Sequence, residues 1–345
     1  MNPKAPKIAG VLPVIKPAGP TSHDVVQIAR RALKERAIGH TGTLDPAADG
    51  LLLLCVGPYT KLVPYLTQAG KTYRGQIGLG LQTTTDDKEG APVLSGDTSH
   101  LTEDHIRNLA MRFIGEIEQM PPRYAAVKVA GKKLYEYARD NEEVEVDPRP
   151  VTVYSFEISN LRMADAPADI LARDPEFDGP KQIALVDFEV KVSSGTYVRS
   201  LARDLGRELG CGGYLASLNR SAVGRFTIDQ AISTEELRSN PEAAETVMLR
   251  GAAAMDAERY PIFTLLKSYE ERLFRGQPMI NQMLANPADV AGLPDDSTVC
   301  LASEDGALLA MVQVERFESE ELAKMYNSRH LARLNSLRVF PKGLR

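Results

Sequence analysis

The chain has 345 residues, of which 43% are apolar and 25% charged; this suits a folded protein of two domains, and no stretch approaches the roughly 18 apolar residues of a membrane span. The N-terminus has no long apolar run and no small-residue cleavage pattern, so we expect no signal peptide and a cytoplasmic location. The net charge of −5 excludes a uniformly basic nucleic-acid binder, and three scattered cysteines and five histidines without paired spacing argue against a disulfide framework or a metal site.

The first part of the chain is basic and begins with a predicted helix. Residues 1–81 hold ten lysines and arginines against four aspartates and glutamates, a net charge of +6 that leaves −11 for the rest. Local basic surface is what phosphate contacts require, so the composition permits an RNA partner without demanding one. Residues 22–36 have apolar positions at helical spacing, and Thr21 or Ser22 can cap this helix.

A glycine-rich loop follows and leads into two predicted strands. The segment GHTGTLDPAADG, residues 39–50, combines glycines, a proline and short polar residues, which is typical of a shaped loop. The apolar run LLLLCV at 51–56 predicts a buried strand, and the alternation in KTYRGQIGLG at 71–80 predicts another strand. The loop therefore precedes a segment that enters the core.

The middle of the chain alternates between helix and strand patterns. We expect a capped helix at 102–113, an extended segment at 124–129, a short helix at 133–139, and strands at 151–159 and 183–193. The turn SSGT after the last strand leads into a further amphipathic helix. Mixed helices and strands in this order predict an α+β domain.

Two later segments depart from this pattern. Residues 164–180, ADAPADILARDPEFDGP, are rich in Ala, Asp and Pro, and we expect a solvated insertion rather than core there. Helical sequence near 233–248 closes the first domain. After about residue 260, the strand-like segments VCLAS and ALLAMVQVE predict a smaller, strand-containing unit.

Four residues are candidates for chemistry, each with a structural alternative. Asp45 is a carboxylate on a shaped loop, which can act as a nucleophile, but an Asp before a Pro also commonly begins a turn. Arg199 stands where a strand turns into a helix; there it can hold a carboxylate ionised or can lie on the surface. Tyr73 fits a catalytic or a core position, and His40 can stack on a base or fill a turn.

Five segments match one set of motifs in a fixed order. They are KPAGPTSHDVV (16–26), GHTGTLDPAADGLLLLCVG (39–57), KTYRGQIGLGLQTTTDD (71–87), GEIEQMPPRYAAVKVAGKKLYEYAR (115–139) and SSGTYVRSLARDLGRELGCGGYLASLNRSAVGRF (193–226). Together they resemble the bacterial tRNA pseudouridine-55 synthase family, also called the B-type pseudouridine synthases. In that family they correspond to a first motif, the catalytic motif, a tyrosine-bearing strand, an insertion that grips the T-arm, and an arginine motif with a pocket segment.

The resemblance implies roles for particular residues. Asp45 is implied as the nucleophile, Arg199 as its partner and Tyr73 as the ring that packs against the flipped uracil. A stacked uridine has to be flipped out before its ring can be reached. Substrate-binding roles are implied for His40, Lys61, Tyr197 and Leu218.

The resemblance also implies an architecture and partners. We expect a pseudouridine-synthase mixed sheet flanked by helices over residues 1–250, with the T-arm-gripping insertion at about 95–148 and the acidic insertion at about 163–180. A divergent, β-rich, PUA-like domain is expected over residues 251–345. The implied activity is isomerisation of uridine-55 in the T-loop of tRNA. No metal, organic cofactor, membrane, guide RNA or obligate protein partner is expected.

Three alternatives stay open. The same fold can serve as a tRNA-binding chaperone without catalysis, or as the catalytic subunit of an RNA-guided pseudouridylation particle. The segment at 115–139 favours the stand-alone enzyme over the guided particle. A glycoside hydrolase would use Asp45 and Asp49 as its two carboxylates, and nothing else in the sequence supports that interpretation.

Overall fold

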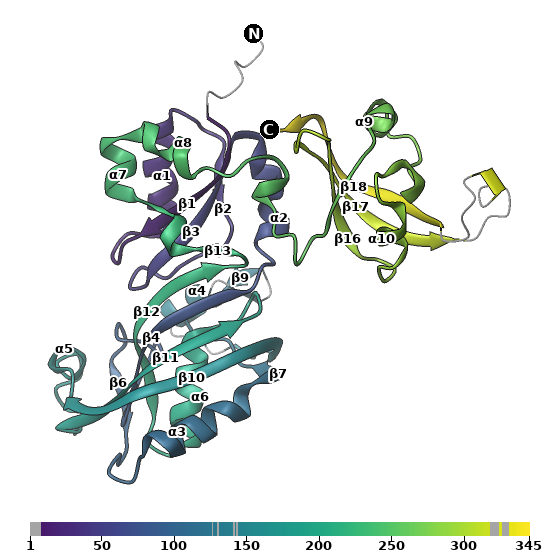
Figure 1. Ribbon diagram of the computed structural model, residues 1–345. Coiled ribbons are helices and arrows are strands. Elements are labelled where there is room, and N and C mark those ends of the chain that lie inside the picture. Colours follow the sequence, from purple (N-terminus) through teal and green to yellow (C-terminus); the bar gives the residue numbers. More distant parts are fainter. Residues whose placement is uncertain are drawn as a thin grey trace.

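A computed structural model gives the fold of the chain and describes residues 8–125, 127–129, 131–140, 142, 144–317, 324–325 and 331–345. Within these residues, ten strands form one mixed sheet and four strands of the C-terminal part form a second sheet (Figure 1). Helices flank the large sheet, so the predicted mixed fold with a small β-rich unit after it is confirmed. The boundary near residue 250 stays a prediction.

The large sheet runs in the order β14-β1-β3-β12-β4-β11-β10-β7, with β2 paired to β3 and β13 paired to β12. The β1–β14 and β3–β12 pairs are parallel, and the remaining neighbours are antiparallel. The strands predicted at 51–56, 71–80, 151–159 and 183–193 are confirmed. The strands of this sheet are β1 (Gly10–Lys16), β2 (Ile38–His40), β3 (Asp49–Val56), β4 (Lys71–Leu79), β7 (Gly115–Gln119), β10 (Arg149–Asp165), β11 (Gln182–Val192), β12 (Gly213–Val223), β13 (Phe226–Thr227) and β14 (Ile232–Ser233).

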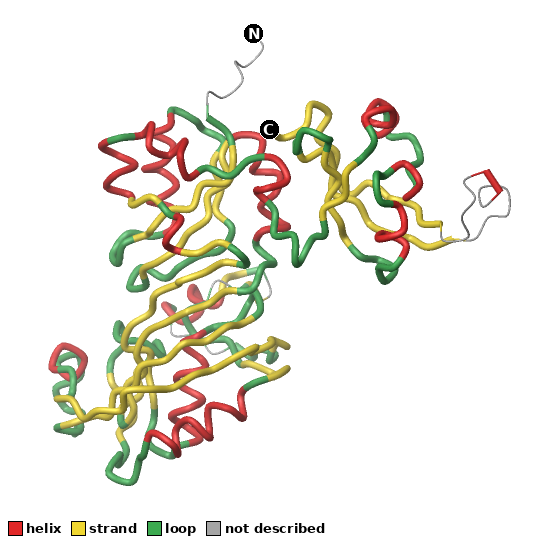
Figure 2. Tube along the Cα trace, in the orientation of Figure 1, coloured by secondary structure: helices red, strands yellow, loops and turns green. Residues whose placement is uncertain are grey.

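Helices cover one face of the long strands. The helices α3 (Glu103–Ala110) and α6 (Val198–Glu208) share a buried apolar cluster with β4, β10 and β11, to which Ile77, Phe156 and Val186 belong. In Figure 2 both helices lie behind these strands, while the short helix α5 (Ala168–Leu171) packs near one end of the opposite face through Ile170. The amphipathic helices predicted at 102–113 and after SSGT are therefore confirmed as the layer that packs on the sheet.

The first helix, α1 (Ser22–Leu33), begins at a capping box. The Thr21 hydroxyl accepts the Asp24 amide at 3.1 Å, and the Asp24 carboxylate accepts the Thr21 amide at 2.8 Å. Of the two possible caps, Thr21 is the one used, and the helix ends at Leu33 rather than at residue 36. The other helices of this part of the chain are α2 (Val63–Leu66), α4 (Leu134–Arg139), α5 (Ala168–Leu171), α7 (Thr234–Ser239) and α8 (Ala244–Val247).

The segment expected to be a solvated insertion is partly buried, so that prediction is wrong for its apolar residues. Within it, α5 carries Ile170, which is 1% exposed and belongs to a buried cluster with Leu81, Ile183 and Tyr214. Leu171 and Phe177 pack against the same cluster. A segment whose composition is rich in Ala, Asp and Pro can still dock through a few well-placed apolar side chains.

The second sheet has the order β15-β16-β17-β18 and shares a core with the first sheet. Cys300, Phe340 and Leu344 belong to the same buried cluster as Val11 of β1 and Tyr59. The strands predicted from VCLAS and ALLAMVQVE are confirmed as β16 and β17. The elements of this unit are β15 (Ile262–Thr264), α9 (Glu270–Phe274), α10 (Pro287–Ala291), β16 (Thr298–Ala302), β17 (Leu308–Phe317) and β18 (Leu331–Leu344). Two short hairpins complete the list of strands: β5 (Leu81–Thr83) with β6 (Pro92–Ser95), and β8 (Lys128–Val129) with β9 (Lys132–Lys133).

Candidate active site

The loop of residues 41–48, between β2 and β3, is fastened to α1 by a buried serine. The Ser22 hydroxyl accepts the Leu44 amide at 2.9 Å and donates to the Leu44 carbonyl at 3.2 Å. Ser22 is 2% exposed, so both bonds are shielded from water. The residue directly before Asp45 therefore has both of its backbone polar groups satisfied by one side chain.

A buried lysine fastens the other side of the same loop. Lys16, at the end of β1, is 0% exposed, and its Nζ donates to the carbonyls of Pro46 at 3.2 Å and Ala48 at 2.6 Å. Burial lowers the pKa of Lys16, against the opposing effect of the carboxylates of Asp49 and Asp45. Lys16 and Ser22 together hold the backbone on both sides of Asp45.

Arg220 of β12 holds the beginning of the loop. Its side chain is 2% exposed and donates to the carbonyls of Leu51 at 2.7 Å, Gly42 at 3.1 Å and Thr43 at 3.4 Å. The close approach of β3 to β12 at this point requires Gly50, whose φ is +112° and where a Cβ would lie 2.5 Å from the Arg220 backbone nitrogen. The loop is thus positioned by side chains from three separate elements.

The carboxylate of Asp45 is paired with Arg199. Arg199 Nε lies 3.0 Å from Asp45 Oδ2; the arginine side chain is 8% exposed and the aspartate side chain 40% exposed. Arg199 Nη1 also lies 3.5 Å from Oδ2 of Asp87, whose side chain is 11% exposed. The guanidinium further donates to the carbonyls of Thr85 at 3.4 Å and Tyr124 at 3.3 Å. One arginine therefore serves two carboxylates, and Asp45 is the more accessible of the two.

The surroundings of Asp45 act on its pKa in opposite directions. Burial raises the pKa of Asp45, Arg199 lowers it, Asp87 raises it, Lys16 lowers it, and the net effect is a raised pKa. The exposed part of the side chain faces a cavity, while dense protein surrounds the remainder. A raised pKa makes this carboxylate more basic than a solvated one, and the guanidinium favours its ionised form.

Asp45 borders a cavity of about 520 Å³, a size suited to a small molecule or a single nucleotide. Tyr73, Tyr197 and Leu218 line it together with Asp45 and Arg199. The structure thus brings five of the seven predicted site residues to one place. The side chains of Tyr73, Tyr197 and Leu218 give the cavity apolar walls against which a flat ligand ring could pack, and the Asp45–Arg199 ion pair makes one part of the cavity charged.

Another cavity, of about 680 Å³, lies against the predicted T-arm-gripping insertion. Its lining includes Met120, Tyr137 and Val144 but neither Asp45 nor Arg199. Because the carboxylate and the arginine meet at the smaller cavity, the smaller cavity is the candidate active site.

The remaining two predicted residues, His40 and Lys61, do not line the cavity that Asp45 borders. His40 is half-buried at the end of β2, its Nδ1 accepts the Gly42 amide at 3.3 Å, and burial lowers its pKa. Lys61 is exposed in the 3₁₀ turn Gly57–Leu62. His40 therefore shapes the start of the loop, and RNA contacts by either residue stay predictions.

Sequence reasoning missed Lys71 as a cavity residue. Lys71 is 7% exposed, lines the cavity and donates from Nζ to the carbonyls of Thr67 at 2.6 Å and Ala69 at 2.7 Å. Burial, reinforced by the nearby charge of Arg220, lowers the pKa of Lys71 to about 8. The period of two along a strand places Lys71 on the same face as Tyr73, a signal that could have identified it.

The two carboxylates of the glycoside-hydrolase alternative, Asp45 and Asp49, do not meet at this cavity. The Asp49 carboxylate accepts a hydrogen bond from the Asn219 side chain and does not line the cavity.

No group of three or more His, Cys, Asp or Glu within the described ranges is placed to hold a metal ion. All three cysteines are buried and free of disulfides. None of the helices in the described part is long and apolar enough to cross a membrane.

Proteins of similar sequence share one description. Residues 30–198 match the profile of the "TruB family pseudouridylate synthase (N terminal domain)", and residues 199–252 match the "tRNA pseudouridylate synthase B C-terminal domain". The tRNA pseudouridine synthase B of Mycolicibacterium paratuberculosis is 46% identical over 67% of this chain and 74% of its own length. Its counterparts from Thermobifida fusca and Corynebacterium diphtheriae are 40% and 37% identical, over 88% and 89% of this chain and 94% and 96% of their own lengths.

Solved structures of lower identity share the fold. A chain in the crystal structure of a Cbf5-Nop10-Gar1 complex matches with a TM-score of 0.66 and 24% identity, over 96% of this chain and 84% of that one. A chain in an H/ACA RNP bound to a substrate RNA containing 2'-deoxyuridine matches with a TM-score of 0.64, 22% identity and the same coverage. At this level of identity the likeness concerns the fold alone.

Proposed function

Since the chain belongs to the TruB family of pseudouridylate synthases, we propose that it is a stand-alone tRNA pseudouridine synthase that converts uridine-55 in the T-loop to pseudouridine. The observation that carries the proposal is the Asp45–Arg199 pair beside a cavity lined by Tyr73, Tyr197 and Leu218. A charged pair next to apolar faces suits a reaction in which a flat base is held, released from its sugar and rejoined.

The reaction is an isomerisation, so substrate and product contain the same atoms. The bond between N1 of the base and C1′ of the ribose breaks, the uracil turns, and C5 bonds to C1′. The C5 proton is released to a base and N1 takes up a proton, so the atoms balance. Ionised Asp45 can start this by attack on the ribose, by attack on the base, or by removal of a ribose proton. In each route Arg199 keeps Asp45 ionised and oriented, and Tyr73 packs against the ring.

Base flipping follows from where the target lies. A uridine in a folded T-loop is stacked, and its extrusion costs a few kcal/mol. The rings of Tyr73 and Tyr197 line the cavity and can replace part of the lost stacking. The cavity volume of about 520 Å³ accommodates one nucleotide at a time.

Contacts between the predicted T-arm-gripping insertion and the site support a stem-loop substrate. The Gln119 side chain donates to the Tyr197 carbonyl at 3.1 Å and accepts the Tyr197 amide at 2.8 Å. The Ser200 hydroxyl donates to the Met120 carbonyl at 2.9 Å. These bonds fix the position of the insertion relative to the first turn of α6, which carries Arg199. An RNA bound by the insertion would therefore be held at a fixed position relative to Arg199.

The test uses purified protein and an unmodified T-arm stem-loop transcript, with pseudouridine mapped by carbodiimide-induced reverse-transcription stops. We expect a stop at the T-loop uridine without guide RNA, its loss in Asp45→Asn, and its retention in Asp49→Asn. Asp49 is the matched control because it flanks the same loop but does not line the cavity. The Asn variants keep the size of the side chain, remove its negative charge and replace one acceptor oxygen with an NH2 group.

Each competing interpretation predicts a different result. Tight tRNA binding without a stop would point to a chaperone, and a stop that requires added guide RNA would point to a guided particle. A stop at another uridine would leave the chemistry in place and change the target. Equal activity of Asp45→Asn and wild type would remove Asp45 from the mechanism.

A further inference from the structure

The loop between β5 and β6, residues 84–91, carries the second carboxylate that contacts Arg199. The Asp87 carboxylate accepts the Thr85 hydroxyl at 2.5 Å and the Glu89 amide at 3.0 Å, so its direction is fixed by the conformation of the loop. Because Arg199 lies between Asp87 and Asp45, a shift of this loop would move the guanidinium relative to Asp45.

One side of this loop is anchored to the catalytic domain. The Leu215 amide donates to the Asp86 carbonyl at 2.9 Å, and the Lys88 amide donates to the Leu215 carbonyl at 3.2 Å. Arg203 Nη1 lies 3.0 Å from Asp86 Oδ2. Asp86 has a φ of +60°, a backbone conformation that needs support from its surroundings.

The other side of the loop is held by the acidic insertion. Arg173, which follows α5, donates from Nη1 to the carbonyls of Lys88 at 2.5 Å and Gly90 at 2.9 Å. Arg173 also pairs with Asp169, four residues earlier in the chain, whose Oδ2 lies 3.7 Å from Arg173 Nη2. In Figure 1, α5 stands beside β6 at the edge of the molecule, next to the hairpin that contains this loop.

The insertion is itself held in place by apolar packing and by a backbone hydrogen bond at its base. Ile170 is buried against Leu81, the first residue of β5, in the cluster that also contains Tyr214. The Ala166 amide donates to the Lys181 carbonyl at 3.0 Å and closes the base of the insertion. The insertion therefore contacts the β5–β6 hairpin in two places, through Ile170 at Leu81 and through Arg173 at the carbonyls of Lys88 and Gly90.

We propose that Arg173 is a positioning residue for the reaction. It holds the 84–91 loop so that Asp87 and Arg199 keep Asp45 in its reactive orientation. The inference rests on the proposed function. It gives the insertion a role as an outer support of the active site, acting through backbone carbonyls rather than through contact with RNA.

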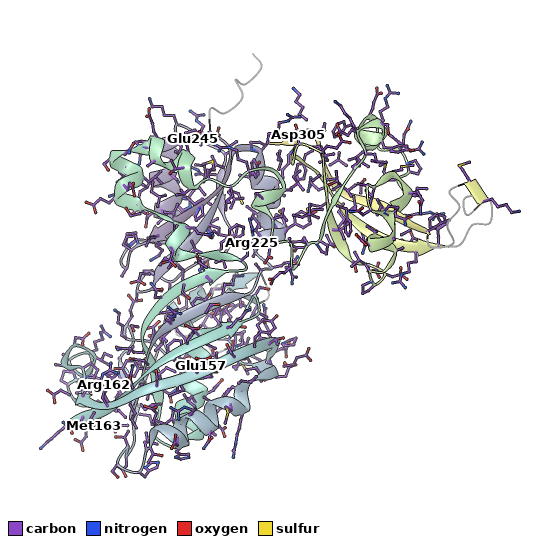
Figure 3. All side chains as sticks on the ribbon, in the orientation of Figure 1. Glu157, Arg162, Met163, Arg225, Glu245 and Asp305 are labelled. Carbon is purple, nitrogen blue, oxygen red and sulfur yellow. The ribbon has the colours of Figure 1, made fainter. Side chains whose placement is uncertain are left out.

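The test compares three variants. Arg173→Met keeps the aliphatic stem and removes the donors, and Arg173→Lys restores one donor. Arg162→Met is the matched control, because Arg162 lies on β10 just before the insertion and pairs with Asp187, with Nη1 3.2 Å from Oδ1. Figure 3 labels Arg162 beside Met163 on β10, and its Nη1 donates to the Asn160 carbonyl at 3.1 Å and to the Asp187 carboxylate, both away from the 84–91 loop.

For Arg173→Met we expect kcat on the T-arm stem-loop to fall roughly three- to tenfold with an unchanged KM, since a sub-ångström misplacement costs less than the roughly hundredfold expected for 1 Å. Displacement of the loop weakens two opposing effects on the pKa of Asp45, the lowering by Arg199 and the raising by Asp87, so the acidic limb of the kcat/KM profile should move away from its wild-type position. Lys16, a further charged group that acts on Asp45, is bound to the carbonyls of Pro46 and Ala48 and lies outside the 84–91 loop. Arg173→Lys should recover part of kcat, and Arg162→Met should match wild type.

Hydrogen exchange supplies a readout that does not depend on turnover. The amides of Lys88 and Leu215 should exchange faster in Arg173→Met than in Arg162→Met. Wild-type exchange together with wild-type kcat and pH profile in Arg173→Met would overturn the inference, as would an equal loss in Arg162→Met. An inactive wild type would overturn the proposed function instead, and the exchange rates would then still decide whether Arg173 holds the loop.

Discussion

The substitution Ser22→Ala tests whether fixation of the 41–48 loop is needed for activity. It removes one hydroxyl that makes two bonds to Leu44, at 2.9 and 3.2 Å, in a site that is 2% exposed. The substitution leaves a buried amide and a buried carbonyl without this partner and changes little else. Since Leu44 directly precedes Asp45, the first effect of the change falls on the predicted nucleophile.

The size of the effect can be worked from these contacts. A net contribution of about 1 kcal/mol per hydrogen bond, and a cost of about 1–3 kcal/mol for each buried group left unpaired, predict a loss of about 2 kcal/mol in unfolding free energy. The melting temperature should fall by a few degrees. We expect kcat to fall roughly tenfold or more, because a shift of about 1 Å at a reacting group can cost about a hundredfold.

The assay pairs single-turnover pseudouridine formation with thermal melts, and Thr21→Ala is the control. Thr21 caps α1 through the Asp24 amide at 3.1 Å, and its loss should cost about 1 kcal/mol without touching the loop. Ser22→Ala should therefore lose kcat well below its melting temperature, and Thr21→Ala should not. Wild-type kcat in a folded Ser22→Ala protein, or an equal loss in both variants, would refute the reasoning.

Three further predictions concern charge. In Asp87→Asn, loss of a carboxylate that raises the pKa of Asp45 should shift the acidic limb of the kcat/KM profile to lower pH; an upward shift would contradict this. Lys71 has a pKa of about 8 in the folded protein against 10.5 for a free lysine, so the unfolded state binds more protons between pH 8 and 10.5. Thermal melts should therefore show that wild type gains stability relative to Lys71→Met as the pH rises through this range. A stability difference that does not depend on pH would contradict the prediction. Turnover of the T-arm stem-loop should persist in EDTA with monovalent salt, because no described cluster offers three metal ligands; a loss restored by a divalent ion would disagree.

Much of the fold could be predicted because its signals are local. The alternation in residues 71–80, the apolar run at 51–56 and the helix cap at Thr21 or Ser22 each depend on neighbours within a few residues. Each of these predictions holds, with Thr21 as the cap that is used. The docking of residues 164–180 depends instead on Ile170 meeting Tyr214 and Leu81 across the chain. The Ala-, Asp- and Pro-rich composition of this segment contains no information about that long-range contact, and it therefore predicts a solvated segment.

The candidate site divides in the same way. The motif resemblance brought Asp45 and Arg199 together, and they lie 3.0 Å apart at the nearest atoms. It gave no sign that Asp87 shares the same arginine, because that contact depends on the turn at Asp86 and on the pairing of the loop with Leu215. Which of two consecutive aspartates turns toward Arg199 is a property of tertiary structure.

The apolar cluster shared by the two sheets has a consequence for how the protein is made. Val11 leaves the ribosome early, whereas Phe340 and Leu344, which belong to the same cluster, are translated far later. Throughout that interval part of the first strand's apolar side has no cover, and nascent chains with uncovered apolar surface are prone to aggregation and are the usual clients of chaperones. Completion of the core therefore waits until translation has passed residue 344, and the speed of elongation becomes part of the folding problem.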